Sequence, residues 1–323
     1  MKLKNRIAIS VLSLVSGLVF ASDQPIIGLI TKTEINPYFV KMKEGAQEAA
    51  KARGVRLLTA SGKFDGDNAS QVAAIENMIA VGAKTILIAP NDSKAIVPAI
   101  RKAREQGVMV IALDTPTDPR EAADALFATD NVKAGILIGQ YAKAAFGDRP
   151  MKIATLNLSP GKLSGIQRHG GFLQGLGIKE GDASVVCAQD SYGDQAKGQT
   201  AMENCLQKNP DINLVYAINE PAAAGAYKAL KAAGKEKSVM LVSIDGACEG
   251  VRNIKAGFMT ATSQQYPLKM AVLGVEAGSD YARIGKKVSG YVDTGVTLIT
   301  DKKQKDIDSK DTNFGLDSCW GRK

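Results

Sequence analysis

The segment PIIGLITKTEINPYFVKMKEGAQEAAKARGVRLLTA, residues 25–60, changes from an apolar run to a helical pattern and back again. Its first part, Pro25–Thr31, is an apolar run of the kind that forms a strand buried on both faces. Pro37–Arg53 is predicted to be a helix, because proline is favoured at the first helical position and Gly54 ends the pattern. Val55–Ala60 is the next predicted strand. A strand, a helix and a strand in this order are typical of a parallel sheet.

The same alternation continues along the chain and restarts near residue 131. Further strands are predicted at Thr85–Ala89, Val108–Leu113, Lys152–Leu156, Ser184–Ala188, Leu214–Ala217 and Val239–Ile244. Further helices are predicted at Asp67–Val81, Ser93–Gln106, Asn131–Ala145, Lys162–Leu176, Gln195–Lys208 and Pro221–Ala233. We therefore expect an α/β fold with two similar doubly wound parallel-sheet lobes. Open α/β sheets bind ligands at the carboxyl ends of their strands, so a cleft between the lobes is the expected site.

The first 21 residues are predicted to be a signal peptide rather than part of the fold. Lys2, Lys4 and Arg6 form a basic start, and Ile7–Phe20 is an apolar run shorter than a membrane-spanning helix needs. Cleavage is expected after Ala21, and an uncleaved membrane anchor is the alternative.

The chain contains four cysteines, Cys187, Cys205, Cys248 and Cys319, which allow three pairings. An exported chain with an even number of cysteines can form disulfides. We favour Cys187–Cys205, which would tie a strand to the next helix, and Cys248–Cys319, which would pin the C-terminal tail. Free buried thiols are the alternative. No pair has the C-x-x-C spacing of a zinc site.

Charge and motif content argue against nucleic-acid binding and catalysis. The formal charge is +8 at pH 7, but the basic residues are scattered among acids, so nucleic-acid binding is not expected. His169 is the one histidine, and no G-x-S-x-G or G-x-x-x-x-G-K-[ST] motif occurs. Asp114 and Asp245 could serve as a glycosidase pair, but the sequence does not give their separation. We predict a binding protein without enzymatic activity, cofactor or metal.

Polar and aromatic side chains follow the predicted strands at one end of both sheets. They include Asn36, Tyr38, Phe39, Asp114, Thr115, Arg168, Tyr192, Asn219, Asp245 and Gln265. Carboxylates accept and amides and arginine donate in the fixed geometry that sugar hydroxyls need, and rings stack on the apolar faces of a sugar. This set predicts a neutral polyhydroxylated ligand. Ordinary core packing of either ring and N-capping by the two aspartates are the alternatives.

Six motifs carry a resemblance to a known family. They are NPYF (36–39), ALDTP (112–116), QRHGGF (167–172), AINEPAAAGA (217–226), VSIDG (242–246) and TSQQYP (262–267). On these motifs the chain resembles the type I periplasmic substrate-binding proteins of ABC sugar importers, in the ribose/galactose-binding group. Within that group, the segments NPYFVKMKEGAQ (36–47), DQAKGQTAMENCLQ (194–207) and PAAAGAYKALKAAGK (221–235) look most like fructose-type members. The resemblance implies that Asn36, Tyr38, Phe39, Asp114, Arg168, Asn219, Asp245 and Gln265 contact the sugar.

Two departures from the ribose binders bear on the ligand. Those proteins have arginine after the aspartate, whereas this chain has Thr115, which makes ribose a less expected ligand. The segment DSYGDQAKG (190–198) is one residue longer than in the ribose binders, so Tyr192, Gly193 or Asp194 is expected to face the ligand.

The resemblance also implies an architecture and a role. The N-terminal lobe would comprise residues 22–129 plus 266–294, and the C-terminal lobe residues 130–265 plus 295–323. A monosaccharide, a fructose-like hexose or pentose, would be captured between the closing lobes of a periplasmic monomer and delivered to the membrane permease of an ABC importer. A receptor that presents a sugar or furanosyl signal to a chemoreceptor is the alternative. A lac-type repressor shares the core but needs an N-terminal helix-turn-helix, where this chain has the expected signal peptide.

Overall fold

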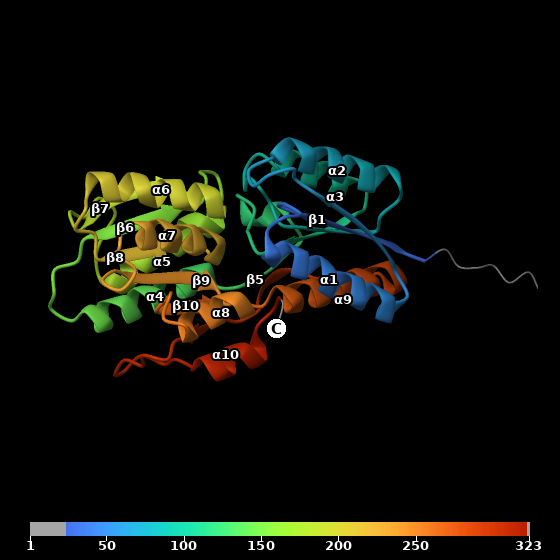
Figure 1. The fold of residues 1–323 in the computed structure, drawn as a ribbon. Coiled ribbons are helices and arrows are strands. Elements are labelled where there is room, and N and C mark those ends of the chain that lie inside the picture. The colour runs from blue at the N-terminus through green and yellow to red at the C-terminus, as the bar shows by residue number, and fades with distance from the viewer. Residues whose placement is uncertain (1–23, 322–323) are drawn as a thin grey trace, which may run out of the picture.

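A computed structural model describes residues 24–321, which form two α/β lobes lying side by side (Figure 1). The expected signal peptide, residues 1–21, lies outside the described residues. Each lobe is built on one sheet with helices on both faces, so the predicted fold class is confirmed. Among the described helices, none is long and apolar enough to cross a membrane.

The first sheet has the strand order β11-β5-β4-β3-β1-β2, and all of its pairs are parallel. Its strands are β1 (Ile26–Thr31), β2 (Arg56–Ser61), β3 (Thr85–Ile88), β4 (Met109–Leu113), β5 (Ala125–Ala128) and β11 (Gly290–Asp293). Helices α1 (Pro37–Arg53) and α9 (Pro267–Ile284) share one apolar cluster on this sheet. Helices α2 (Asn68–Ala80) and α3 (Val97–Glu105) share the cluster on the other face, and a short 3-10 turn, Arg120–Ala122, precedes β5.

The second sheet has the order β12-β10-β9-β8-β6-β7, with only β12 antiparallel to its neighbour. Its strands are β6 (Ile153–Asn157), β7 (Val185–Asp190), β8 (Leu214–Ala217), β9 (Met240–Asp245), β10 (Ala261–Gln264) and β12 (Thr297–Ile299). Helices α4 (Asn131–Phe146) and α5 (Leu163–Leu176) cover one face. Helices α6 (Gln195–Lys208) and α7 (Glu220–Ala232) cover the other, beside α8 (Cys248–Lys255) and α10 (Thr312–Ser318).

Local chemistry places the start of α1 at the predicted residue. The Asn36 side chain accepts a hydrogen bond from the backbone of Tyr38 at 3.0 Å, and Pro37 occupies the first helical position. Gly54 ends the helix in the left-handed conformation, with φ of 59°. Asp67, the first residue of the predicted helix Asp67–Val81, caps α2 by accepting a hydrogen bond from the backbone of Ser70 at 3.0 Å.

The chain passes between the two sheets three times in the described residues. It crosses between β5 and α4, between β10 and α9, and between β11 and β12. The residue at which each lobe begins stays a prediction.

Both favoured disulfides are present, so the predicted pairing is confirmed. Cys187–Cys205 joins β7 to α6 with a Cα–Cα distance of 5.6 Å. Cys248–Cys319 joins the start of α8 to the residue after α10, with a Cα–Cα distance of 5.0 Å. The four cysteines therefore leave no free thiol.

Candidate functional site

A small cavity between the lobes gathers most of the residues that the sequence analysis singled out. Eight of the ten predicted site residues line it, together with Lys32, Asp65 and Leu158. The eight are Asn36, Tyr38, Phe39, Asp114, Arg168, Asn219, Asp245 and Gln265. The cavity volume is about 20 Å³, which is room for roughly one water molecule. A sugar-sized ligand therefore enters only when the lobes or their side chains move apart.

Asp114 is the centre of a buried ion cluster in this cavity. It follows β4 directly, and its Oδ2 lies 2.8 Å from the ammonium nitrogen of Lys32, while its Oδ1 lies 3.5 Å from Arg168 Nη2. Burial alone would raise the pKa of Asp114, but the nearby Lys32 and Arg168 cations more than offset burial, and the pKa is lowered. The carboxyl group is therefore ionised at neutral pH and can accept hydrogen bonds from ligand hydroxyls.

Arg168 connects this cluster to a second carboxylate. Its guanidinium donates to Asn131 Oδ1 at 2.6 Å and to Gln265 Oε1 at 3.0 Å, and Nη1 lies 3.9 Å from Asp245 Oδ1. Gln265 in turn donates to Asp245 Oδ1 at 2.7 Å. Burial raises the pKa of Asp245, although Arg168 opposes that effect. These contacts fix the plane of the guanidinium before a ligand arrives.

The backbone is strained at several of these positions. Four described non-glycine residues have positive φ, namely Asp114 (62°), Tyr192 (55°), Asp245 (150°) and Asp306. Three of the four belong to the predicted site. Non-glycine residues in such conformations cost free energy and cluster at functional sites, which independently marks these strand ends.

The two rings at the start of α1 pack in the core and also line the cavity, so they combine the two roles that the sequence left open. Tyr38 and Phe39 are 3% and 4% exposed, belong to the core cluster of the first lobe, and line the cavity as well. Their ring centroids lie 5.2 Å apart in an edge-to-face arrangement. Burial raises the pKa of Tyr38, so its phenol keeps its proton and remains a donor.

Two predicted site residues lie outside the cavity lining. Thr115 is buried beside it, where its hydroxyl accepts from Lys32 at 2.7 Å and lies 2.7 Å from the hydroxyl of Ser164. Tyr192 is 37% exposed in the loop after β7, with the ammonium of Lys197 4.0 Å from its ring centroid. Tyr192 therefore does not face the cavity in this arrangement of the lobes.

Several contacts hold the lobes together around the cavity. Thr115 and Ser164 come from different lobes, and so do Lys162 and Asp65, which form an ion pair. The backbone of Ser93 also donates to the carbonyl of Gly161 at 3.0 Å. The lobes are therefore closed on each other.

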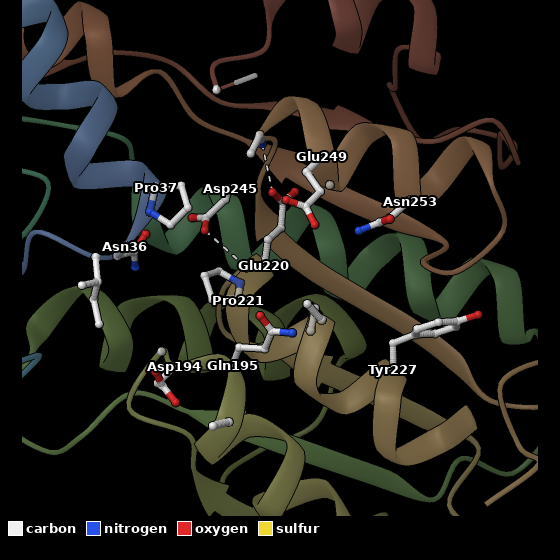
Figure 2. Close-up of a pocket in the computed structure, with 18 of the residues that line it drawn as sticks. Asn36, Pro37, Asp194, Gln195, Glu220, Pro221, Tyr227, Asp245, Glu249 and Asn253 are labelled. Carbon is white, nitrogen blue, oxygen red and sulfur yellow. Dashed lines mark hydrogen bonds between the residues drawn. The ribbon is translucent and has the colours of Figure 1, made fainter. Parts of the chain in front are cut away.

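A wider groove leads outward from the cavity along the second lobe. It has a volume of about 1190 Å³ and shares Asn36, Asp65 and Asp245 with the cavity. Figure 2 shows Asp245 and Pro37 at its inner end and Tyr227 and Asn253 farther along α7 and α8. Tyr192 lines this groove, so its ring lies on the route to the cavity.

The chain matches the periplasmic binding protein domain family over residues 27–287. It is a member of the periplasmic binding protein family. The ribose import binding protein of Bacillus subtilis is 33% identical over 276 residues, which cover 85% of this chain and 87% of that protein. The family resemblance predicted from the six motifs is confirmed.

Solved structures agree with this assignment. The Caulobacter myo-inositol binding protein, bound to myo-inositol, has a TM-score of 0.81 and 26% identity over 88% of this periplasmic binding protein and 96% of that chain. An ABC transporter solute-binding protein from Actinobacillus succinogenes with bound D-allose has a TM-score of 0.78 and 28% identity, over 86% of this chain and 98% of that one.

The sequence analysis missed four residues of this site in the periplasmic binding protein. Lys32, Asp65 and Leu158 line the cavity, and Asn131 holds Arg168. Lys32 directly follows β1, so the strand-end rule that selected the other residues also points to it. Lysine is usually solvent-exposed, so the residue type alone does not indicate a buried cation in a ligand site.

The described residues contain no group of three or more histidine, cysteine, aspartate or glutamate side chains that could hold a metal ion. His169 lies outside the cavity lining, with its ring nitrogens 3.0 Å from Asn157 Oδ1 and 2.8 Å from Glu180 Oε2. Its polar contacts are therefore local and lie away from the cavity.

Proposed function

We propose that this periplasmic binding protein captures a neutral monosaccharide or cyclic polyol between its lobes and delivers it to the permease of an ABC importer. The observation that carries the proposal is the charge balance of the cavity. Two cations, Lys32 and Arg168, face two carboxylates, Asp114 and Asp245, within one cluster, and the third carboxylate of the lining, Asp65, is paired with Lys162. An ionic ligand would leave one of these buried charges uncompensated, which is costly, whereas a neutral ligand does not.

The donors and acceptors of the cluster suit hydroxyl groups. Each hydroxyl both donates and accepts, and the cavity offers carboxylates, amides, a guanidinium and an ammonium. On binding, ligand hydroxyls would take over hydrogen bonds that Lys32 and Arg168 now make to Asp114. Tyr38 and Phe39 would supply the apolar wall against which the C–H face of a sugar packs.

The comparisons support the ligand class and leave the sugar open. Relatives and structural neighbours are named for ribose, D-allose and myo-inositol, which are small, neutral and polyhydroxylated. A fructose-like sugar remains our proposal from the resemblance. The comparisons give no support to the chemoreceptor alternative.

The remaining parts of the proposal concern architecture and location. We place the N-terminal lobe at residues 22–129 plus 266–294 and the C-terminal lobe at residues 130–265 plus 295–323. We propose that the leader is removed after Ala21, that the protein works in the periplasm as a monomer, and that it turns over no substrate. A ligand contacts both lobes only in the closed form, so binding would favour closure. The closed lobes would then present one continuous surface to the permease.

Calorimetric titration of residues 22–323, after unfolding and refolding to remove carried-over sugar, tests the proposal. The panel holds fructose, ribose, allose, arabinose, galactose, myo-inositol and sugar alcohols, with gluconate and ribose 5-phosphate as anionic controls. We expect one ligand per protein at micromolar affinity or tighter, about −8 kcal/mol or more favourable. No heat from any neutral sugar, or tighter binding of an anionic control, would refute the proposal.

A further inference from the structure

The C-terminal segment connects the second lobe to the candidate ligand site. Helix α10 packs on α8 and β12 of the second lobe, and Leu316 and Cys319 pack against an apolar cluster there. Trp320, one residue later, belongs instead to the core cluster of the first lobe and is 4% exposed. In Figure 1 this end of the chain lies at the junction between the lobes. The segment therefore contacts both lobes within two residues.

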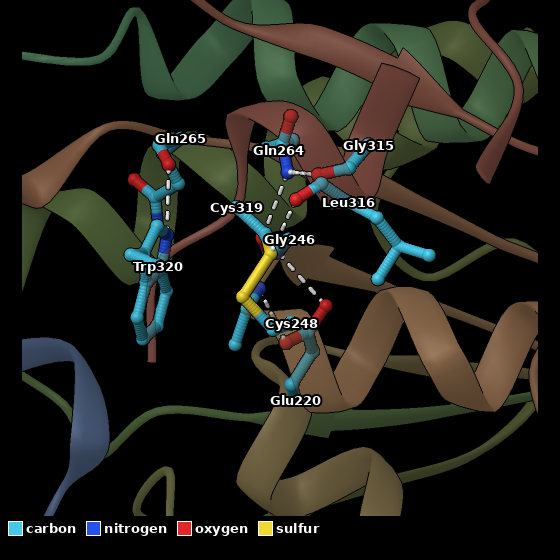
Figure 3. The surroundings of a disulfide bond; sticks show 10 residues. Glu220, Gly246, Cys248, Gln264, Gln265, Gly315, Leu316, Cys319 and Trp320 are labelled. Atoms are coloured by element: carbon cyan, nitrogen blue, oxygen red, sulfur yellow. Dashed lines mark hydrogen bonds between the residues drawn. A yellow bond between two sulfur atoms is a disulfide. The ribbon is translucent and has the colours of Figure 1, made fainter. Parts of the chain in front are cut away.

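Three kinds of contact anchor this segment (Figure 3). The disulfide Cys248–Cys319 ties it to the start of α8. The backbone of Cys248 donates to the carbonyl of Trp320 at 2.9 Å, beside a parallel bridge between Trp320 and Ala247. Gln264 donates to the carbonyls of both Gly315 and Gly246, at 3.0 and 2.9 Å. The position of the indole is thus fixed by covalent and backbone contacts.

The indole touches two residues that line the cavity, although it does not line the cavity itself. Its ring meets Tyr38 edge to face, with centroids 5.3 Å apart and an interplanar angle of 81°. Its Nε1 donates to the backbone carbonyl of Gln265 at 2.9 Å. Tyr38 begins α1 of the first lobe, and Gln265 follows β10 of the second sheet and bonds both Arg168 and Asp245. Trp320 thereby sets the position of one cavity residue on each side of the site.

We propose that Trp320, held in place by the Cys248–Cys319 disulfide, is a positioning residue for the ligand site. Loss of this disulfide then weakens ligand binding, whereas loss of Cys187–Cys205 does not. The proposal rests on the proposed function for the identity of the ligand. Cys187–Cys205 is the matched control, because both of its cysteines are buried in the apolar cluster of α6 and α7 and neither lines the cavity.

The test compares ligand dissociation constants of four proteins at a temperature where circular dichroism shows each to be folded. They are the wild type, Trp320→Phe, Cys248→Ser/Cys319→Ser and Cys187→Ser/Cys205→Ser. We expect the Kd of Cys248→Ser/Cys319→Ser to rise roughly tenfold, because the freed indole loses a ring contact and a buried hydrogen bond. Trp320→Phe keeps a ring but loses the N–H donor, so we expect roughly a threefold to fivefold rise. The Kd of the control, Cys187→Ser/Cys205→Ser, should stay within about twofold of the wild-type value, even where its unfolding midpoint falls.

Trp320 is the single tryptophan of the chain, so its fluorescence gives a second readout. Ligand addition should change its emission in the wild type. Acrylamide should quench it more strongly in Cys248→Ser/Cys319→Ser than in the control. A role confined to stability would shift unfolding midpoints and leave both the dissociation constants and the quenching unchanged.

The outcomes separate the two proposals. If the wild type binds a sugar and Trp320→Phe and Cys248→Ser/Cys319→Ser bind it equally well, the inference is overturned and the proposed function stands. If Cys248→Ser/Cys319→Ser does not fold, Trp320→Phe decides by the same comparison. If the wild type binds no sugar, the proposed function fails, and hydrogen exchange at residues 36–40 and 264–266 decides the inference. Faster exchange there in Cys248→Ser/Cys319→Ser than in the control supports it, and equal exchange overturns it.

Discussion

Replacing Lys32 with methionine tests the buried ion cluster most directly. Lys32 is 3% exposed, and methionine keeps most of its length while removing the charge. The change leaves the buried Asp114 carboxylate without the ammonium that lies 2.8 Å from it. Breaking a buried pair by removing one partner costs about 3–5 kcal/mol of unfolding free energy. We expect the lower end, about 3 kcal/mol, because Arg168 still lies 3.5 Å from the other carboxylate oxygen.

The pH dependence of this loss has a definite sign. The pKa of Asp114 is lowered in the folded protein, so its stabilising contribution is present above the unfolded pKa of aspartate and is lost as pH falls through the folded pKa. In Lys32→Met, Arg168 is the one of these two cations that still opposes the effect of burial, so the pKa of Asp114 rises. The deficit of the variant should therefore be largest at neutral pH and shrink on acidification, as protonation removes the buried charge.

Urea unfolding followed by circular dichroism at pH 7 and pH 4.5 measures both effects. With a slope of about 3 kcal/mol per molar urea, the upper end for small proteins, the midpoint at pH 7 should fall by roughly 1 M. The matched control is Lys43→Met, which breaks the exposed pair with Glu34 and should change stability by less than about 1 kcal/mol. Lys32→Met/Asp114→Asn should recover part of the loss, because no unpaired charge remains. An unchanged midpoint in Lys32→Met, or a deficit that grows on acidification, would refute the reasoning.

Four further substitutions address the site and the packing around it. Asp114→Ala and Arg168→Ala should each weaken binding of the sugar found by titration by about 2–5 kcal/mol, and near-normal calorimetric affinity in both would contradict the site assignment. Gly135→Ala should lower the unfolding free energy by about 1–3 kcal/mol, because the added carbon would meet the carbonyl oxygen of Arg168 at 2.2 Å. Gly170→Ala is its control, since nothing lies within 4 Å of the added carbon, and equal urea midpoints for the two would contradict the packing argument. Lys162→Met removes an ion pair between the lobes, so we expect a larger radius of gyration by X-ray scattering without ligand; an unchanged radius would count against this pair as a latch.

The fold was predictable because most of its buried strands are continuous apolar runs, an exception being β10 (ATSQ), which is buried but mostly polar. Strands such as β1, β4 and β9 are buried along nearly their whole length, so each shows in the sequence as an apolar run between helical patterns. The edge strand β11 was not predicted, because its residues, Gly290–Asp293, are largely exposed and carry no such run. The terminal helix α10 has only seven residues, too few to show a helical period.

The site was predictable where a short side chain directly follows a strand. Asp114 and Asp245 lie at the ends of β4 and β9, so the topology of parallel strands alone brings them to one edge. Tyr192 is set instead by the conformation of a loop, which strand positions do not determine. Lys32 was not predicted, because its partner Asp114 lies 82 residues away in the sequence. Pairing across that separation depends on the order of the strands in the sheet rather than on local sequence.

The contacts between the lobes bear on how affinity is set in this protein. The pairs Lys162–Asp65 and Thr115–Ser164 join the lobes, and of their four side chains only Asp65 lines the cavity. Such contacts favour the closed form whether or not a ligand is bound, and the apparent affinity rises with the fraction of binding-competent protein. In the proposed binding mode the central contact between Arg168 and Asp114 acts in the opposite way, because the ligand hydroxyls would displace it. Affinity therefore depends on a balance between contacts that ligand entry breaks and contacts that it leaves intact. Weakening the peripheral pairs should lower affinity without changing which sugar is preferred, whereas substitutions at Lys32 should change the preference itself.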